Sequence, residues 1–186
     1  MNMKGNRKTI YVFWTGGYDS TFRIIQLSLY KVFIQPIYIS DNRLSEKNEL
    51  QAISEITSLL KNRDETKALF FDLIYVEKHS IKSNIDITNS YLKLWEKYKL
   101  GSQYDWLARY AHEHNIKIEL GLEKEIKSHA YQVLFDSDLI TREHLTGCEY
   151  KELSYESINI DKDIYTVFSN FLFPLPLFEM SKLEVL

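Results

Sequence analysis

The sequence contains a single cysteine, Cys148, among its 186 residues. One thiol excludes an internal disulfide framework and a zinc site built from several cysteines, and it suits a reducing compartment. No uninterrupted apolar run approaches the length that crosses a bilayer, and the N-terminal segment lacks the apolar stretch of a signal peptide. We therefore expect a cytoplasmic protein that is not embedded in a membrane.

Positive charge is also scarce. Lysine and arginine number 23 against 26 acidic residues, which gives a net charge of −3. Such a chain has no overall basic field to attract nucleic acid, although a local basic groove would be compatible with it. His112 and His114 are two residues apart on a predicted helix and point in different directions, whereas a helical zinc pair needs a spacing of about four. The sequence therefore predicts no metal site made of histidines or cysteines.

What the sequence does contain is enough apolar residues for one compact core. Hydrophobic residues make up 45% and charged residues 26%, as in ordinary globular proteins. We expect one domain over residues 1–186, since this length is too short for two ordinary domains. Residues 181–186 are expected to begin a helix that the chain does not finish, so a truncated domain of a longer protein is an alternative.

Strand-like and helix-like segments alternate along the chain. The expected strands are residues 10–14, 32–39, 68–76, 116–122 and part of 167–178. The expected helices are 20–30, 45–60, 91–98, 104–114 and 123–134, with 136–140 leading to another helix. This alternation predicts a three-layer α/β/α fold with a mainly parallel, five-stranded, Rossmann-like sheet and right-handed crossovers.

Two strands carry further expectations. Pro36 lies within the second strand, and because proline cannot donate a ladder hydrogen bond it predicts an edge position or a bulge. The third strand, 68–76, is almost continuously apolar, which is typical of a parallel strand that is covered on both faces.

The segment that dominates the sequence is Thr15-Gly16-Gly17-Tyr18-Asp19-Ser20-Thr21, between the first strand and the first helix. Two glycines allow the backbone to turn its N–H groups toward one point. Ser20 and Thr21 can cap or open the helix, whose N-terminus carries partial positive charge. This arrangement predicts an anion cradle, with phosphate as the expected anion. A glycine turn that merely joins strand and helix is the alternative.

Two common phosphate motifs do not fit this loop. A Walker loop ends in Lys-Ser or Lys-Thr, and no lysine lies between Thr15 and Tyr30. The dinucleotide motif requires a third glycine and a residue between the first two. The loop instead resembles the Ser-Gly-Gly-x-Asp-Ser motif of the PP-loop ATP pyrophosphatases, with Thr15 in place of the first serine.

The resemblance extends along most of the chain and is strongest to the 7-cyano-7-deazaguanine synthase subfamily of queuosine biosynthesis. The segments that carry it are Tyr38 to Arg43 before Glu49-Leu50, Leu107 to Ala111 before Ile118 to Gly121, and Pro174 to Glu184 with Ser181 in place of threonine. It implies a fold of the adenine nucleotide alpha hydrolase (HUP) type.

There are also departures from that subfamily. Gly101-Ser102-Gln103 replaces an Arg-Asn pair, Cys148-Glu149 lacks an arginine, and the zinc-binding cysteine cluster is missing. The resemblance therefore supports adenylation chemistry more than it supports a deazapurine substrate.

The resemblance also implies roles for single residues. The loop would hold the β- and γ-phosphates of ATP, with Gly16 and Gly17 giving backbone donors and Thr15, Ser20 and Thr21 giving hydroxyls. Tyr18 is a further candidate contact. Asp19 would hold the loop or approach Mg²⁺, and its alternative is a helix cap.

Other segments would complete the site. Ile39 and Ser40 would present backbone atoms to adenine, and Gly121 would allow close approach of the nucleotide. Since the loop has no lysine, Lys182 and Arg43 are the expected cation clamps on the phosphates, although each could be a solvated side chain. Parallel sheets bind ligands at the carboxyl ends of their strands, so Thr15–Thr21, Ser40–Arg43 and Gly121 are expected on one rim.

These expectations define an enzyme that adenylates a carboxylate or amide oxygen of a small molecule or nucleobase and releases pyrophosphate. Two alternatives remain at this stage. One is a binding or sensing module for ATP or AMP without chemistry, and the other is the ATP-binding subunit of a larger enzyme. Cys148 is expected to be an inert thiol, and the sequence leaves a homodimer open.

Overall fold

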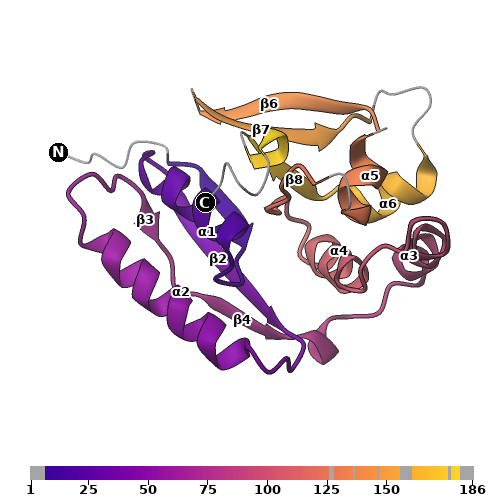
Figure 1. The fold of residues 1–186 in the computed structure, drawn as a ribbon, viewed down its shortest axis with the longest axis horizontal. Coiled ribbons are helices and arrows are strands. Elements are labelled where there is room, and N and C mark those ends of the chain that lie inside the picture. Colours follow the sequence, from indigo (N-terminus) through magenta and orange to yellow (C-terminus); the bar gives the residue numbers. More distant parts are fainter. Residues whose placement is uncertain are drawn as a thin grey trace. The chain divides into compact units, whose positions relative to one another are not determined.

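The protein has an α/β fold, seen here in a computed structural model (Figure 1). It describes residues 7–125, 128–135, 137–145, 147–155, 161–175 and 177–180. These residues form six α-helices and eight strands with mixed parallel and antiparallel pairing, not the five strands predicted, and the chain divides into two compact units, Met1–Glu77 and Lys78–Leu186. Within the described residues, no helix combines the length and the apolar character needed to cross a membrane.

The first unit consists of βαβ crossovers. Its elements are β1 (Thr9–Phe13), α1 (Tyr18–Ser28), β2 (Phe33–Ser40), α2 (Glu46–Lys61), β3 (Leu69–Phe70) and β4 (Ile74–Glu77). β1 pairs with β2 in parallel from Thr9↔Phe33 to Phe13↔Ile37. The predicted strand, helix, strand and helix at the start of the chain are therefore confirmed, with ends that shift by one or two residues.

Pro36 lies in a strand that is paired on both sides, so the predicted edge position is wrong. β2 pairs in parallel with β1 on one side and with β3 and β4 on the other. The alternative prediction of a bulge describes what happens beside the proline. Ile34 pairs with Phe70 and Ile37 with Ile74, so residues 35–36 lie opposite the three residues 71–73.

This bulge divides the predicted strand 68–76 into β3 and β4. Proline has no N–H for the ladder, and the side chain of Gln35 donates instead to the carbonyls of Pro36 and Asp72, at 3.1 and 2.8 Å. The expectation that this strand is covered on both faces is also wrong, since Leu69 and Tyr75 are about half exposed. The bulge interrupts the alternation of side chains between β3 and β4.

The second unit combines helices with a mixed sheet. Its main elements are α3 (Ile85–Tyr98), α4 (Gln103–Glu113), β5 (Ile118–Glu119), α5 (His129–Phe135), β6 (Leu139–Leu145), β7 (Cys148–Leu153), α6 (Lys162–Phe168) and β8 (Phe171–Pro174). Short 3₁₀ turns follow β4 at Lys78–Ser80 and β8 at Leu177–Glu179. β5 pairs with β8 in parallel, whereas β7 pairs with β8 and with β6 in antiparallel fashion.

Several predictions for this unit need correction. Residues 136–140 were expected to lead to a helix, but Leu139 begins an antiparallel hairpin, β6 and β7. The helix expected at 123–134 is only α5, and the strand expected at 116–122 is only β5. α3 begins six residues before the predicted Tyr91, because the Asn84 side chain accepts hydrogen bonds from the N–H groups of Asp86 and Ile87. The predicted helix at 181–186 lies outside the described residues.

The core of the second unit is aromatic. Phe168 of α6 and Phe171 and Phe173 of β8 are fully buried. The ring of Phe168 lies 5.9 Å from that of Phe171 and 6.4 Å from that of Phe173, in edge and tilted arrangements. β8 confirms the strand predicted within 167–178, shortened because Val167 and Phe168 end a helix.

Candidate functional site

The glycine-rich segment forms the connection between β1 and α1. β1 ends at Phe13, and the Trp14 N–H donates to the Ile37 carbonyl at 2.9 Å, which holds the start of the loop beside β2. Gly16 adopts φ +73°, a left-handed conformation that L side chains rarely take. α1 then begins at Tyr18 with Gly17 at its N-cap. Thr15 to Thr21 therefore lie at the carboxyl end of a parallel strand and at the N-terminus of a helix.

Close packing also requires glycine at position 16. A β-carbon at this position would lie 3.0 Å from the Glu49 carbonyl oxygen and 3.5 Å from Cβ of Ala52. The loop thus rests against the second helix, α2, with no room for a side chain. Gly17 has a φ of −73°, and the nearest atom to its would-be β-carbon is Thr15 Oγ1 at 3.4 Å. Of the two glycines, Gly16 therefore fixes the shape of the loop.

The helix cap differs from the prediction. Ser20 and Thr21 were expected to cap or open α1, and a cap was the alternative for Asp19; Gly17 holds the capping position, so Ser20 and Thr21 lie at the start of the helix without capping it. Asp19 lies in the first turn of α1 instead. The amide groups of a helix's first turn have no carbonyl partners within the helix, so this end of α1 presents donors and partial positive charge.

The loop hydroxyls have distinct surroundings. Thr21 Oγ1 accepts a hydrogen bond from the indole Nε1 of the fully buried Trp14 at 2.9 Å. An accepting hydroxyl can still donate its own proton, so Thr21 can donate to a ligand while Trp14 orients it. Ser20 is mostly buried and lies 3.4 Å from the Gly17 carbonyl, whereas Tyr18 is 68% exposed.

Ile39 and Ser40 end the strand beside the loop. β1 and β2 run in parallel, so the end of β2 lies on the same rim as the loop, as predicted for Ser40. Both residues are buried. The Ser40 hydroxyl donates to Glu46, in the first turn of α2, and Tyr75 of β4 donates to the other oxygen of Glu46 at 2.8 Å.

Arg43 is already paired in this structure. Its Nε donates to Asp41 Oδ1 at 2.7 Å, and its Nη1 lies 3.7 Å from Glu49 Oε1. Burial lowers the pKa of Arg43, but the hydrogen bond to Asp41 and the charges of Glu49 and Asp41 outweigh this and raise it. The guanidinium is therefore permanently charged, and the two carboxylates neutralise part of the charge that a phosphate would meet.

Glu49 is the residue that the sequence reading of the site missed. It accepts hydrogen bonds from Tyr38 at 2.7 Å and from Ser45 at 2.7 Å, in addition to its contact with Arg43. Burial and then the bond to Glu49 raise the pKa of Tyr38, which keeps the phenol a neutral donor. One signal in the sequence could have indicated this role. Only a few residues separate the end of β2 from the start of α2, so carboxylates in the first turn of α2 can reach back to the strand.

The remaining predicted site residues lie in the second unit or outside the described residues, so their placement at this rim stays a prediction. Gly121 follows β5 in the second unit, and Lys182 and Ser181 lie outside the described residues. Cys148 is fully buried. Throughout the described ranges, no group of three or more histidine, cysteine, aspartate or glutamate side chains is arranged to hold a metal ion.

A buried polar pair in the second unit is also outside the sequence predictions. His144 Nε2 and Glu119 Oε1 are 2.9 Å apart, with side chains 4% and 0% exposed. The register of β6 against β7 shifts between Glu143 and Leu145, so His144 lies at a bulge. Bulges re-aim side chains, and this one turns the imidazole of a polar strand toward a buried carboxylate. The ring of Tyr150 lies 4.3 Å from that of His144.

No protein-family model matches the chain, and no curated protein matches it significantly.

Proposed function

We propose that the protein binds ATP through Thr15 to Thr21 and adenylates a carboxylate or amide oxygen of a small acceptor, with release of pyrophosphate. The observation that carries the proposal is the strand, left-handed glycine and helix arrangement, in which Gly16 is fixed against the Glu49 carbonyl. The resemblance to PP-loop enzymes of the HUP type supports the assignment to ATP.

Each part of the loop has a place in this chemistry. The N-terminus of α1 and the Thr21 hydroxyl would bind the β- and γ-phosphates, since charge accumulates on the leaving pyrophosphate. Mg²⁺, when bound, would neutralise phosphate charge. Magnesium sites in nucleotide enzymes commonly use one or two carboxylates together with the phosphates, so Asp19 alone would suffice from this chain. Ile39 and Ser40, at the end of β2, would offer backbone atoms to adenine.

The reaction is tested by its products. The full chain is incubated with ATP, Mg²⁺ and a panel of carboxylic acids that includes deazapurine carboxylates, and the released pyrophosphate and AMP are quantified. The proposal expects pyrophosphate only when a suitable acceptor is present. Hydrolysis to ADP and phosphate would overturn it.

The binding site is tested by charge at Tyr18. This side chain is exposed and is the first residue of α1, where a carboxylate is favourable to the helix by about 0.3–1 kcal/mol. Tyr18→Glu should therefore keep the fold stable while it weakens ATP binding at least about tenfold by repelling phosphate. Tyr18→Gln is the matched control, and equal affinity of the two variants would argue against phosphate at this loop.

A second candidate is an ATP- or AMP-binding module without chemistry. It is favoured by one observation, that Arg43 is engaged by Asp41 and Glu49. If Arg43 is a clamp on the phosphates, Arg43→Met should slow pyrophosphate release far more than it weakens ATP binding. ATP binding without any turnover in wild type would favour the module, or an ATP-binding subunit that requires another chain.

A further inference from the structure

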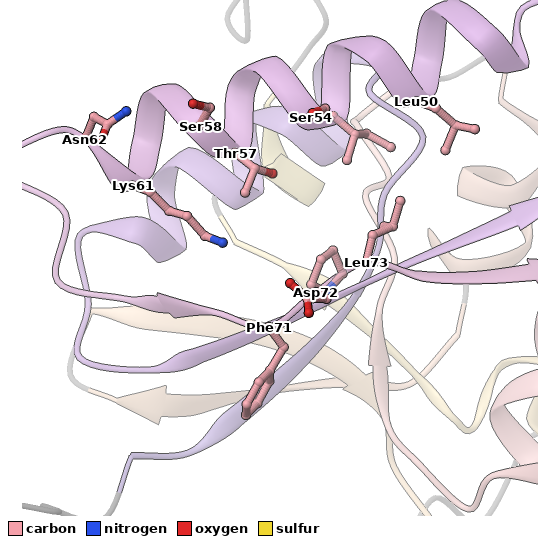
Figure 2. Close-up of a pocket in the computed structure, with 11 residues that line it drawn as sticks. Leu50, Ser54, Thr57, Ser58, Lys61, Asn62, Phe71, Asp72 and Leu73 are labelled. Atoms are coloured by element: carbon pink, nitrogen blue, oxygen red, sulfur yellow. The ribbon is translucent and has the colours of Figure 1, made fainter.

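A groove of about 520 Å³ runs between α2 and the bulge that separates β3 from β4 (Figure 2). It belongs wholly to the first unit. One wall is a single stripe of α2 with helical spacing, from Leu50 through Ser54 and Thr57 to Lys61. The other wall is formed by Phe71, Asp72 and Leu73 together with Pro36.

The bulge accounts for the groove. Residues 71–73 take three positions opposite two residues of β2, so the chain leaves the regular ladder at this point. Gln35 fixes the displaced segment through its bond to the Asp72 carbonyl, at 2.8 Å. The groove is therefore a consequence of Pro36 and is held open by hydrogen bonding within the sheet.

The groove is apolar at one end and charged at the other. Leu50, Ile53 and Leu73 line the apolar end, next to the first turns of α2. At the other end Lys61 and Asp72 point into the groove from opposite walls (Figure 2). No ion pair joins Lys61 or Asp72 to any of the residues that the structure describes, although carboxylate–ammonium pairs occur elsewhere in the chain, such as Lys93 with Asp163.

We infer that this groove binds a free α-amino acid with an apolar side chain. The ligand's carboxylate would pair with Lys61 and its ammonium with Asp72, because two opposite charges that face each other without contact are complementary to a zwitterion placed between them. The hydroxyls of Ser54 and Thr57 offer additional partners for the polar head. The side chain of the ligand would lie against Ile53 and Leu73, which gives the site its preference for apolar amino acids.

This site is separate from the phosphate loop. Gly16 contacts α2 at Glu49, and twelve residues of helix separate Glu49 from Lys61, which corresponds to roughly 18 Å at 1.5 Å per residue. A carboxylate held by Lys61 is therefore too distant to be the acceptor that attacks ATP at the loop. The groove fits an effector site, and its ligand can be tested in the absence of nucleotide.

The test uses NMR titration of the ¹⁵N-labelled full chain with L-leucine, without ATP. Saturable shifts are expected for the backbone amides of Ser54, Thr57 and Asp72. Glycine keeps both charges but lacks the apolar side chain, and N-acetyl-L-leucine lacks the ammonium, so both should bind at least about fivefold more weakly. Lys61→Gln and Asp72→Asn should each weaken leucine binding by about five- to tenfold.

Lys47→Gln and Asp64→Asn serve as matched controls, since these exposed charges lie on α2 and just beyond it without lining the groove. They should leave leucine affinity unchanged. Absence of saturable shifts with leucine would overturn the inference, as would equal binding by wild type, Lys61→Gln and Asp72→Asn. If the chain binds leucine but not ATP, the proposed ATP site at the loop is wrong and the proposed amino-acid site in the groove is retained.

Discussion

At the level of single residues, the two loop glycines make a matched pair. Gly16 combines a φ of +73° with a would-be β-carbon 3.0 Å from the Glu49 carbonyl, whereas Gly17 has neither constraint. Gly16→Ala should therefore lower the free energy of unfolding by about 1–2 kcal/mol, and Gly17→Ala by clearly less. Urea titration of both variants checks this, and equal losses would show that the loop relaxes around the added methyl group.

The Glu119–His144 pair gives a second prediction for single residues. Loss of the imidazole leaves the buried Glu119 carboxylate with one hydrogen bond fewer and no access to water, so His144→Ala should cost about 3 kcal/mol. Arg142→Ala is the control on the same strand. Its bond to Glu152 is 2.6 Å long but the arginine is 57% exposed, so the loss should stay below about 1 kcal/mol. Chemical denaturation measures both, and similar losses would contradict the assignment of a buried pair.

At the level of elements, Asp163 joins α6 to α3. Its Oδ1 accepts from Ser90 at 2.8 Å and from Lys93 at 3.1 Å. Burial raises the pKa of Asp163, but the bonds from Ser90 and Lys93 and the charge of Lys93 outweigh this and lower it.

A lowered pKa in the folded state makes the contribution of Asp163 depend on pH. The contribution is fully present above the carboxyl's ordinary pKa and disappears as the pH falls through the lowered value. The difference in unfolding free energy between wild type and Asp163→Asn should therefore shrink between pH 6 and about pH 2, from no more than about 1 kcal/mol. A difference that is constant with pH would show that the carboxylate's charge is not involved.

The elements also show what the sequence could and could not predict. The loop, β1, α1, β2 and α2 follow from apolar periodicity and the two glycines, which are local signals. The β6–β7 hairpin does not, because Thr141, Arg142 and Glu143 are exposed and leave no alternating apolar pattern. β3 and β4 were merged because the bulge opposite Pro36 depends on pairing between strands, which no local pattern records. The partners of Arg43, Asp41 and Glu49, are close to it in sequence, but no periodic pattern shows that the turn brings these side chains together.

At the level of the whole molecule, the division at Glu77 leaves the expected single domain over residues 1–186 a prediction, since each compact unit is defined only by its own contacts. The α/β class and the parallel pairing of β1, β2, β3 and β4 are confirmed. Net charge is likewise a property of the whole chain. With 26 acidic against 23 basic side chains, the chain has no overall positive charge to drive binding to DNA.

We therefore expect no retardation of a short DNA duplex in a gel shift at about 50 mM salt, where non-specific electrostatic binding would be strong. Polyglutamate, a polyanion without nucleobases, is the control that reveals binding through charge alone. Retardation that weakens steeply with added salt would reveal a local basic groove that the net charge conceals.

The hydrogen bond between Trp14 and Thr21 also gives a way to detect a ligand in the loop by NMR. Trp14 is fully buried, and its indole N–H ends on the hydroxyl that is expected to face a ligand. Any molecule that takes a hydrogen bond from Thr21 polarises that hydroxyl and alters the electronic environment of the indole proton. The Nε1–H resonance of Trp14 is thus a native, label-free sensor of loop occupancy.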